Sequence, residues 1–151
     1  MSGIKYFPKD LSLENKTIVL RVDFNVPIIE KKIQDFTKIS LVLPFLRELI
    51  KKKSKVILLS HLGRPKGKRN AALSLLPIYK YLKEKINTNM YFYTGEINSE
   101  LNTKCSYLRN GEIILIENIR FFNQETENDE NFSKKIGELG DIYINDAFSC
   151  S

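Results

Sequence analysis

Polar side chains suited to binding an anion follow four short apolar segments of the sequence. Arginine guanidinium groups match phosphate and carboxylate oxygens with two parallel hydrogen bonds, and amide and imidazole N–H groups supply further donors. If these side chains converge, we expect a pocket for a small, strongly anionic molecule, whereas any one group alone fits the start of a solvated loop equally well. The groups are Arg21, Asp23 and Asn25; Ser60, His61 and Arg64; Glu117, Asn118 and Arg120; and Asn145 and Asp146.

Short, β-branched apolar runs alternate along the chain with longer segments of helical spacing, which is typical of an α/β protein. We predict strands over residues 17–20, 56–59, 90–93, 112–116 and 142–144, and helices over residues 37–53, 74–85 and 129–140. Residues 96–110 are ambiguous and fit a short helix followed by a turn. The predicted fold is therefore a three-layer α/β sandwich with an open, mostly parallel, Rossmann-like sheet and helices on both faces.

Strand–helix–strand spacing indicates parallel strands, and parallel strands place their carboxyl ends at one edge of the sheet. That edge is where open α/β sheets bind ligands. Because all four polar groups have the same position relative to their strands, we interpret them as parts of one binding site.

The composition limits the possible classes of protein. With 151 residues, of which 42% are hydrophobic and 28% charged, the chain is long enough for one packed domain. It has no apolar run of the ~18 residues that span a membrane and no secretory signal at its start, so we expect a cytoplasmic protein. Cys105 and Cys150 form no CxxC pair, and with His61 as the single histidine they leave too few ligands for a zinc site.

The formal net charge of +6 favours an anionic partner, either a nucleic acid, an acidic surface or a phosphorylated metabolite. Residues 51–69 carry eight lysine and arginine residues and no acidic residue. Lys51, Lys52 and Lys53 close a predicted helix, where cations complement the helix dipole. Nonspecific nucleic-acid binding through Lys51 to Arg69 is an alternative hypothesis, but it leaves the strand-end pattern unexplained.

Four motifs in the chain resemble the N-terminal domain of phosphoglycerate kinase, and they occur in the order and at the spacing of that family. The resemblance extends from about Phe7 to the last residue, and four ordered motifs are far more specific than net charge. The motifs are RVDFNVP at residues 21–27, SHLGRPKG at 60–67, ENIRF at 117–121 and DIYINDAF at 141–148.

The resemblance implies an enzyme of glycolysis that transfers a phosphoryl group between 1,3-bisphosphoglycerate and ADP, giving 3-phosphoglycerate and ATP, with Mg²⁺ accompanying the nucleotide. It implies that Asp23 and Asn25 contact the hydroxyl and carboxyl region of 3-phosphoglycerate. By the same resemblance, His61, Arg64 and Arg120 hold the phosphate end of this substrate. Arg21 would add positive charge to the same site, and phosphoryl transfer depends on such alignment and charge stabilisation.

Lys38 stands where phosphoglycerate kinases carry an arginine that is thought to steady the migrating phosphoryl group. The resemblance therefore implies that Lys38 is both a substrate-binding and a catalytic residue. A lysine keeps the positive charge but lacks the guanidinium fork, so we expect slower chemistry, with a barrier higher by about 1–3 kcal/mol.

The resemblance also implies that residues 1–151 form an incomplete N-terminal substrate-binding domain, since the family's C-terminal nucleotide-binding domain is absent. We therefore expect this chain to be inactive alone, to bind no metal or cofactor itself, and to meet ADP or ATP only through the missing domain. By analogy with the family we expect a monomer without nucleic-acid or membrane partners. A non-catalytic anion-binding module that uses the same edge is a further alternative hypothesis.

Overall fold

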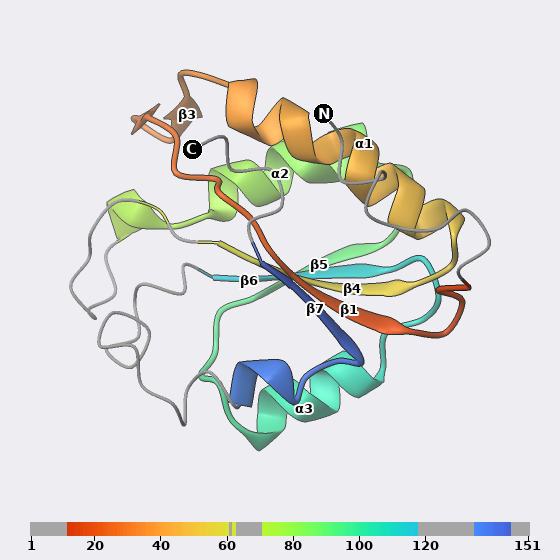
Figure 1. The fold of residues 1–151 in the computed structure, drawn as a ribbon. Helices are drawn as coiled ribbons and strands as arrows, with labels where there is room; N and C mark the ends of the chain where they lie inside the picture. Colours follow the sequence, from red (N-terminus) through yellow and green to blue (C-terminus); the bar gives the residue numbers. More distant parts are fainter. Residues whose placement is uncertain (1–11, 61, 63–70, 118–134, 146–151) are drawn as a thin grey trace.

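A parallel five-stranded sheet forms the centre of the computed structural model, which describes residues 12–60, 62, 71–117 and 135–145 (Figure 1). The strand order is β5–β6–β4–β1–β7, and every neighbouring pair is parallel. The predicted strands are confirmed to within a residue or two at their ends. Their bounds are β1, Thr17–Arg21; β4, Lys55–Leu59; β5, Met90–Tyr93; β6, Ile113–Ile116; and β7, Ile142–Asn145.

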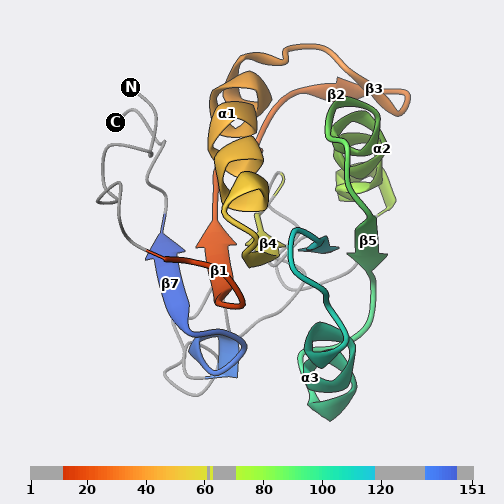
Figure 2. The same ribbon diagram turned by 90° about the vertical axis from the view of Figure 1, so that its right-hand side faces the viewer.

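Helices cover both faces of this sheet, which confirms the three-layer arrangement (Figures 1 and 2). Helices α1 (Thr37–Lys51) and α2 (Leu76–Lys85) lie over one face. Helix α3 (Ser99–Ser106) lies over the other face, together with a short helical segment at residues 135–137. A short 3-10 helix, η2 (Ala71–Leu73), precedes α2. Among the described helices, none combines the length and the apolar character that crossing a membrane requires.

The alternation of side chains along β1 divides the interior into two cores. Ile18 and Leu20 belong to the core beneath α1 and α2, while Val19 belongs to the core beneath α3. All three are fully buried, because a strand in the middle of a covered sheet has no face toward solvent. The same reasoning explains the continuous apolar runs of β4 and β6, in which Val56–Leu59 and Ile113–Ile116 are buried.

Polar side chains accept hydrogen bonds from main-chain N–H groups at the starts of α1, α2 and α3, but only α3 has a side-chain cap. Asp35 accepts hydrogen bonds from the Thr37 N–H and hydroxyl, at 2.9 and 2.7 Å, and these bonds hold the pKa of Asp35 below its ordinary value. The Ser74 hydroxyl oxygen accepts from Leu76 N–H at 3.1 Å, but the cap position of α2 is Leu75, so the prediction that Ser74 caps this helix is wrong and Ser74 lies one residue before the cap. The Asn98 side chain caps α3 at Glu100 N–H, which settles the ambiguous segment as a short helix.

Helix α1 ends earlier than its hydrophobic spacing predicts. The last helical residue is Lys51, whereas the spacing extends to Lys53. Lys53 has a φ of 62°, in the left-handed region, and this conformation ends the helix.

A two-stranded hairpin that the sequence analysis missed connects β1 to α1. Strands β2 (Ile28–Ile29) and β3 (Lys32–Ile33) pair antiparallel, and the hairpin lies beside α2 (Figure 2). The two residues between them, Glu30 and Lys31, have φ values of 51° and 66°. Turns of this kind usually contain Gly, Asn or Asp, so Glu and Lys at these positions carry no turn signal.

Gly140 allows the chain to pass close to the start of β1. A Cβ atom at Gly140 would lie 2.8 Å from the Thr17 carbonyl oxygen and 2.9 Å from Val19 Cγ2. Beside it, Asp141 N–H donates to the Thr17 carbonyl oxygen, and Thr17 N–H donates to Asp141 Oδ2, both at 2.8 Å. These bonds dock the start of β7 onto β1, and they require a residue without a side chain at position 140.

Glu112 joins the starts of β5 and β6. It is 7% exposed and accepts hydrogen bonds from Arg109 N–H at 2.8 Å, Asn89 Nδ2 at 3.0 Å and the Tyr91 hydroxyl at 3.1 Å. Burial by itself raises the pKa of Glu112, but these three donors together outweigh burial and lower the pKa below its ordinary value. The ionised carboxylate therefore stabilises the folded state.

We expect Gly140→Ala to lower the free energy of unfolding by about 1–3 kcal/mol, because the added methyl group meets the Thr17 carbonyl oxygen and the buried Val19 side chain, which have little freedom to move. Gly137→Ala is the matched control, since a Cβ atom there meets nothing within 4 Å. Urea denaturation of both variants would measure the difference. Equal stability of the two variants would contradict this account of Gly140.

We expect the stability contributed by Glu112 to be complete above pH 4.5, the ordinary pKa of the group, and to be lost as the pH falls through the lowered pKa of the folded state. Glu112→Gln should therefore cost about 1 kcal/mol at neutral pH and should remove part of the acid sensitivity. Urea denaturation between pH 7 and pH ~3 would test this. Glu84→Gln, at an exposed position of α2, is the control, and an identical pH dependence in both variants would disprove the role of Glu112.

Candidate functional site

The carboxyl ends of the central strands lie at one edge of the sheet, as the sequence predicts. Arg21, the last residue of β1, is opposite Leu59 at the end of β4 and opposite Asn145 at the end of β7. The described polar residues that follow these strands therefore leave the sheet at the same edge. His61, Arg64 and Arg120 from the predicted site lie outside the described residues, as do Asn118 and Asp146.

Asp23, Asn25 and Lys38 are brought together at this edge in one hydrogen-bonded network. Lys38 Nζ lies 2.9 Å from Asp23 Oδ2 and donates to the Asn25 carbonyl oxygen at 3.2 Å. Asn25 N–H in turn donates to Asp23 Oδ1 at 2.9 Å. The Asp23 carboxylate thus stabilises the turn at residues 23–25. Lys38 links this turn to the start of α1.

The β2–β3 hairpin explains how Lys38 reaches Asp23. Gln34 N–H donates to the Pro27 carbonyl oxygen at 2.8 Å, which closes the base of the hairpin. The hairpin consequently brings residue 34 back beside residue 27, and α1 begins next to the segment that follows β1. This hairpin is a positioning element that sequence reasoning missed, since its turn residues carry no signal.

The electrostatic environment of Lys38 is that of a partly exposed ion pair. Lys38 and Asp23 have 46% and 29% of their side-chain surface exposed. A cation in the first turn of a helix opposes the helix dipole, and the Asp23 carboxylate offsets that unfavourable interaction. Because exposed pairs add little stability, the main effect of this pair is on geometry.

Glu117 has a different role from the one its position after β6 suggests. Its carboxylate is buried and accepts from the Ser74 hydroxyl at 2.5 Å and from Leu75 N–H at 2.7 Å. These contacts tie the end of β6 to the start of α2. Glu117 therefore has a structural role, because it supports this edge of the sheet.

The cationic run at residues 51–69 is described only in part, and the described part has a structural explanation. Lys51 is the last residue of α1, and Lys52 forms an i,i+4 pair with Glu48 at 3.8 Å. Lys55 begins β4 and is half-buried. Residues 61 and 63–70 lie outside the described part of the chain.

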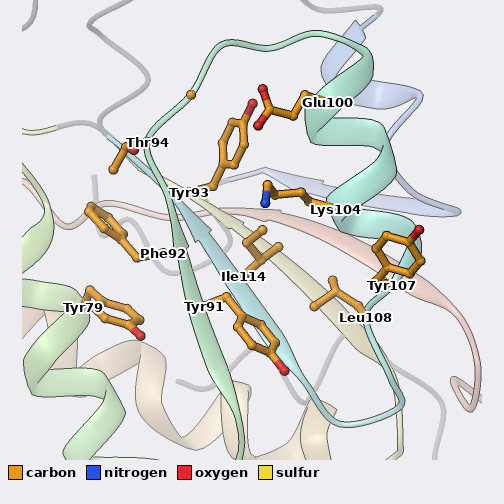
Figure 3. A pocket seen from close by; sticks show the side chains of 11 residues that line it. Tyr79, Tyr91, Phe92, Tyr93, Thr94, Glu100, Lys104, Tyr107, Leu108 and Ile114 are labelled. Carbon is orange, nitrogen blue, oxygen red and sulfur yellow. The ribbon is translucent and has the colours of Figure 1, made fainter.

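A separate hollow of about 740 Å³ lies along β5, at the outer edge of the sheet (Figure 3). Tyr79 and Phe92 form one wall, and Lys104 and Tyr107 of the α3 region form the other. The Tyr79 hydroxyl donates to the Met90 carbonyl oxygen at 2.8 Å, which covers part of the open edge of β5. This hollow is separated from β1 by β6 and β4, so it is not part of the predicted site.

No group of three or more His, Cys, Asp or Glu side chains suited to a metal ion occurs within residues 12–60, 62, 71–117 and 135–145. Cys105 is free and buried, and burial raises the pKa of its thiol to about 12. The thiol therefore stays protonated near neutral pH and is a poor nucleophile.

The fold places the chain in the class of open-sheet α/β domains, in which ligand sites commonly lie at the carboxyl ends of the strands. A sequence model of the family described as phosphoglycerate kinase matches residues 8–151. Phosphoglycerate kinase from Borrelia hermsii is 44% identical over 140 residues, which are 93% of this chain and 36% of that protein. Phosphoglycerate kinase from Wolbachia pipientis is 42% identical over 143 residues, which are 95% of this chain and 36% of that protein.

Two solved structures have the same fold. Phosphoglycerate kinase from Coxiella burnetii matches with a TM-score of 0.78 and 36% identity over 89% of this chain and 33% of that chain. Phosphoglycerate kinase from Pyrococcus horikoshii matches with a TM-score of 0.80 and 27% identity over 98% of this chain and 37% of that chain. The chain belongs to the phosphoglycerate kinase family, and it spans about a third of the length of the curated relatives it matches.

We expect a double-mutant cycle of Asp23→Asn and Lys38→Met to give a coupling energy of about 0.2–1 kcal/mol, the range of partly exposed ion pairs. Urea denaturation of the parent chain, both single variants and the double variant would measure it. The Glu48–Lys52 pair on the same helix, with its longer separation of 3.8 Å, is the reference and should couple more weakly. A coupling of zero for Asp23 and Lys38 would show that their contact does not persist in solution.

Proposed function

We propose that this chain forms the 3-phosphoglycerate half of a phosphoglycerate kinase active site. The observation that carries the proposal is the Asp23–Asn25–Lys38 network at the carboxyl edge of the sheet, in a chain of this family. Phosphoryl transfer requires little covalent work from a protein, and it depends on alignment and on stabilising charge. A rigid turn with a lysine held beside it meets the first of these requirements.

In this proposal the described residues bind the reacting end of the substrate, where the carboxyl group gains or loses the transferred phosphoryl group. Asp23 and Asn25 contact the hydroxyl and carboxyl region of 3-phosphoglycerate, and Lys38 acts as a point charge near the transferred phosphoryl group. Asn25 is exposed, so a ligand can approach it from solvent. His61, Arg64 and Arg120 hold the phosphate end, and Arg21 adds positive charge.

Asp23 limits what Lys38 can do. The carboxylate lies 2.9 Å from the ammonium group and offsets much of its charge, so Lys38 by itself is a weak anion site. A tri-anionic substrate therefore needs the additional cations of the site. An arginine would donate two parallel hydrogen bonds to two oxygens at once, whereas Lys38 carries the same charge on one ammonium group. This difference is the basis for the slower chemistry expected.

The complete reaction needs a nucleotide site that these residues do not supply in the proposal. The relatives named phosphoglycerate kinase are about three times as long as the matched region. ADP or ATP, with its Mg²⁺, is bound by the C-terminal domain of the whole enzyme, and the 151-residue chain alone does not turn over. The whole enzyme acts in glycolysis as a cytoplasmic monomer. Phosphoryl transfer catalysed by the purified 151-residue chain would overturn this part of the proposal.

We expect 3-phosphoglycerate to shift the amide resonances of Asp23, Asn25 and Lys38 in a saturable way when it is added to the labelled chain at fixed ionic strength. Inorganic phosphate should act more weakly, because it lacks the carboxyl and hydroxyl groups. Lys38→Met should weaken binding by about three- to tenfold, which corresponds to one partly screened charge.

Lys83→Met is the matched control for this titration, since it removes the same charge from an exposed position of α2. If both variants lose affinity equally, or if phosphate and 3-phosphoglycerate act alike, binding is nonspecific and the proposed function is wrong. A single-stranded RNA oligonucleotide that shifts residues 51–55 instead, with a steep dependence on salt, would favour the nucleic-acid hypothesis.

A further inference from the structure

The strands β1 and β4 separate just before the residues of the proposed site. Their main-chain pairing continues one bond past the end of β1, where Val22 N–H donates to the Leu59 carbonyl oxygen at 2.9 Å. Each of the two segments beyond this bond carries polar residues of the predicted site. The position of Asp23 and Asn25 therefore depends on what holds the chain immediately after Val22.

The side chain of Ser60 provides the next bond. Phe24 N–H donates to Ser60 Oγ at 2.9 Å, and both residues are fully buried. A side-chain hydroxyl thus takes the place of a main-chain acceptor at the point where the strand pair ends. A buried N–H group without an acceptor is strongly unfavourable, so this bond favours one position of the segment.

We propose that Ser60 is a positioning residue of the 3-phosphoglycerate half-site, a role that rests on the proposed function. Phe24 lies between Asp23 and Asn25, so anchoring its N–H group fixes the two residues on either side of it. Asp23 and Asn25 then close the network with Lys38. Ser60 holds the segment from the β4 side and Lys38 holds it from the α1 side. Ser60 acts through the position of this segment and does not need to touch the ligand.

The chain contains a matched control for this role at the opposite end of the same strand. Ser54 directly precedes β4, is fully buried, and donates from its hydroxyl to the Leu49 carbonyl oxygen at 2.8 Å. Like Ser60, it has a buried hydroxyl bonded to a main-chain group. Unlike Ser60, it lies at the amino end of β4, away from Asp23 and Asn25.

The test compares the full chain with Ser60→Ala, Ser60→Thr and Ser54→Ala. Urea denaturation gives the stability of each protein, and a titration with 3-phosphoglycerate gives its Kd under conditions where each is folded. We expect both alanine variants to be less stable, but only Ser60→Ala to bind about five- to tenfold more weakly, because a displaced turn misaligns two ligand contacts. Ser60→Thr, which keeps the hydroxyl group, should restore most of the affinity.

A second measurement needs no ligand. In hydrogen exchange, the Phe24 amide should lose protection in Ser60→Ala and keep it in Ser54→Ala, because only the first variant removes its acceptor. If Ser60→Ala does not fold, Ser60→Cys replaces it, since a thiol preserves the shape and is a weaker acceptor. The cysteine variant should then show the same changes to a smaller extent.

The outcomes separate the two proposals. If the parent chain binds 3-phosphoglycerate and Ser60→Ala binds equally well, Ser60 has no positioning role, although the proposed function stands. If the parent chain does not bind, the proposed function fails and the role of Ser60 in binding fails with it. Equal losses of affinity in Ser60→Ala and Ser54→Ala would show a general effect of stability and would also overturn the inference.

Discussion

The parallel pairing of β1 with β4 and β7 is the constraint on which the rest of the structure depends. Parallel pairing puts the carboxyl ends of these strands at one level, so residues that are far apart in the sequence leave the sheet from the same edge. Burial enforces the pairing, because Ile18, Val19 and Leu20 pack against helices on both faces and a slip of one residue would exchange the two cores. The close passage of Gly140 over β1 then fixes where β7 joins. The gathering of strand-end residues at this edge is thus a consequence of how the hydrophobic core is built.

The ion pair of Asp23 and Lys38 offsets the unfavourable position of a lysine at the start of α1. A site for an anionic metabolite needs cations, yet a cation in the first turn of α1 opposes the helix dipole. Asp23 offsets this by pairing with Lys38, and the same carboxylate caps the turn at Asn25. The pairing leaves a smaller net positive charge at the place proposed for the substrate. The arrangement therefore favours precise placement of Asn25 and Lys38 over raw electrostatic attraction.

Other polar groups near the edge serve the scaffold, and their chemistry explains why. Glu117 and Ser60 both follow strands, and both are buried, so each must satisfy hydrogen-bond partners inside the protein. Glu117 ties β6 to the start of α2, and Ser60 takes the N–H of Phe24 where β1 and β4 part. A strand-end polar residue can thus support a site without lining it. Burial of its side chain distinguishes the two cases, and burial is a property of the fold.

The sequence by itself determined the class of fold, the place of the strands and the family, because apolar periodicity and ordered motifs are local signals that survive without coordinates. Residues 17–20, 56–59 and 112–116 could be recognised as buried strands. Local spacing left α3 open and misplaced the end of α1, which lies at Lys51. Only the tertiary structure decided that the unsignalled hairpin at Glu30 and Lys31 returns the chain so that Lys38 meets Asp23, and that Glu117 turns inward. The physical reason is that spacing along a chain sets which face a side chain occupies, whereas its partners depend on contacts between segments that the chain brings together only when it folds.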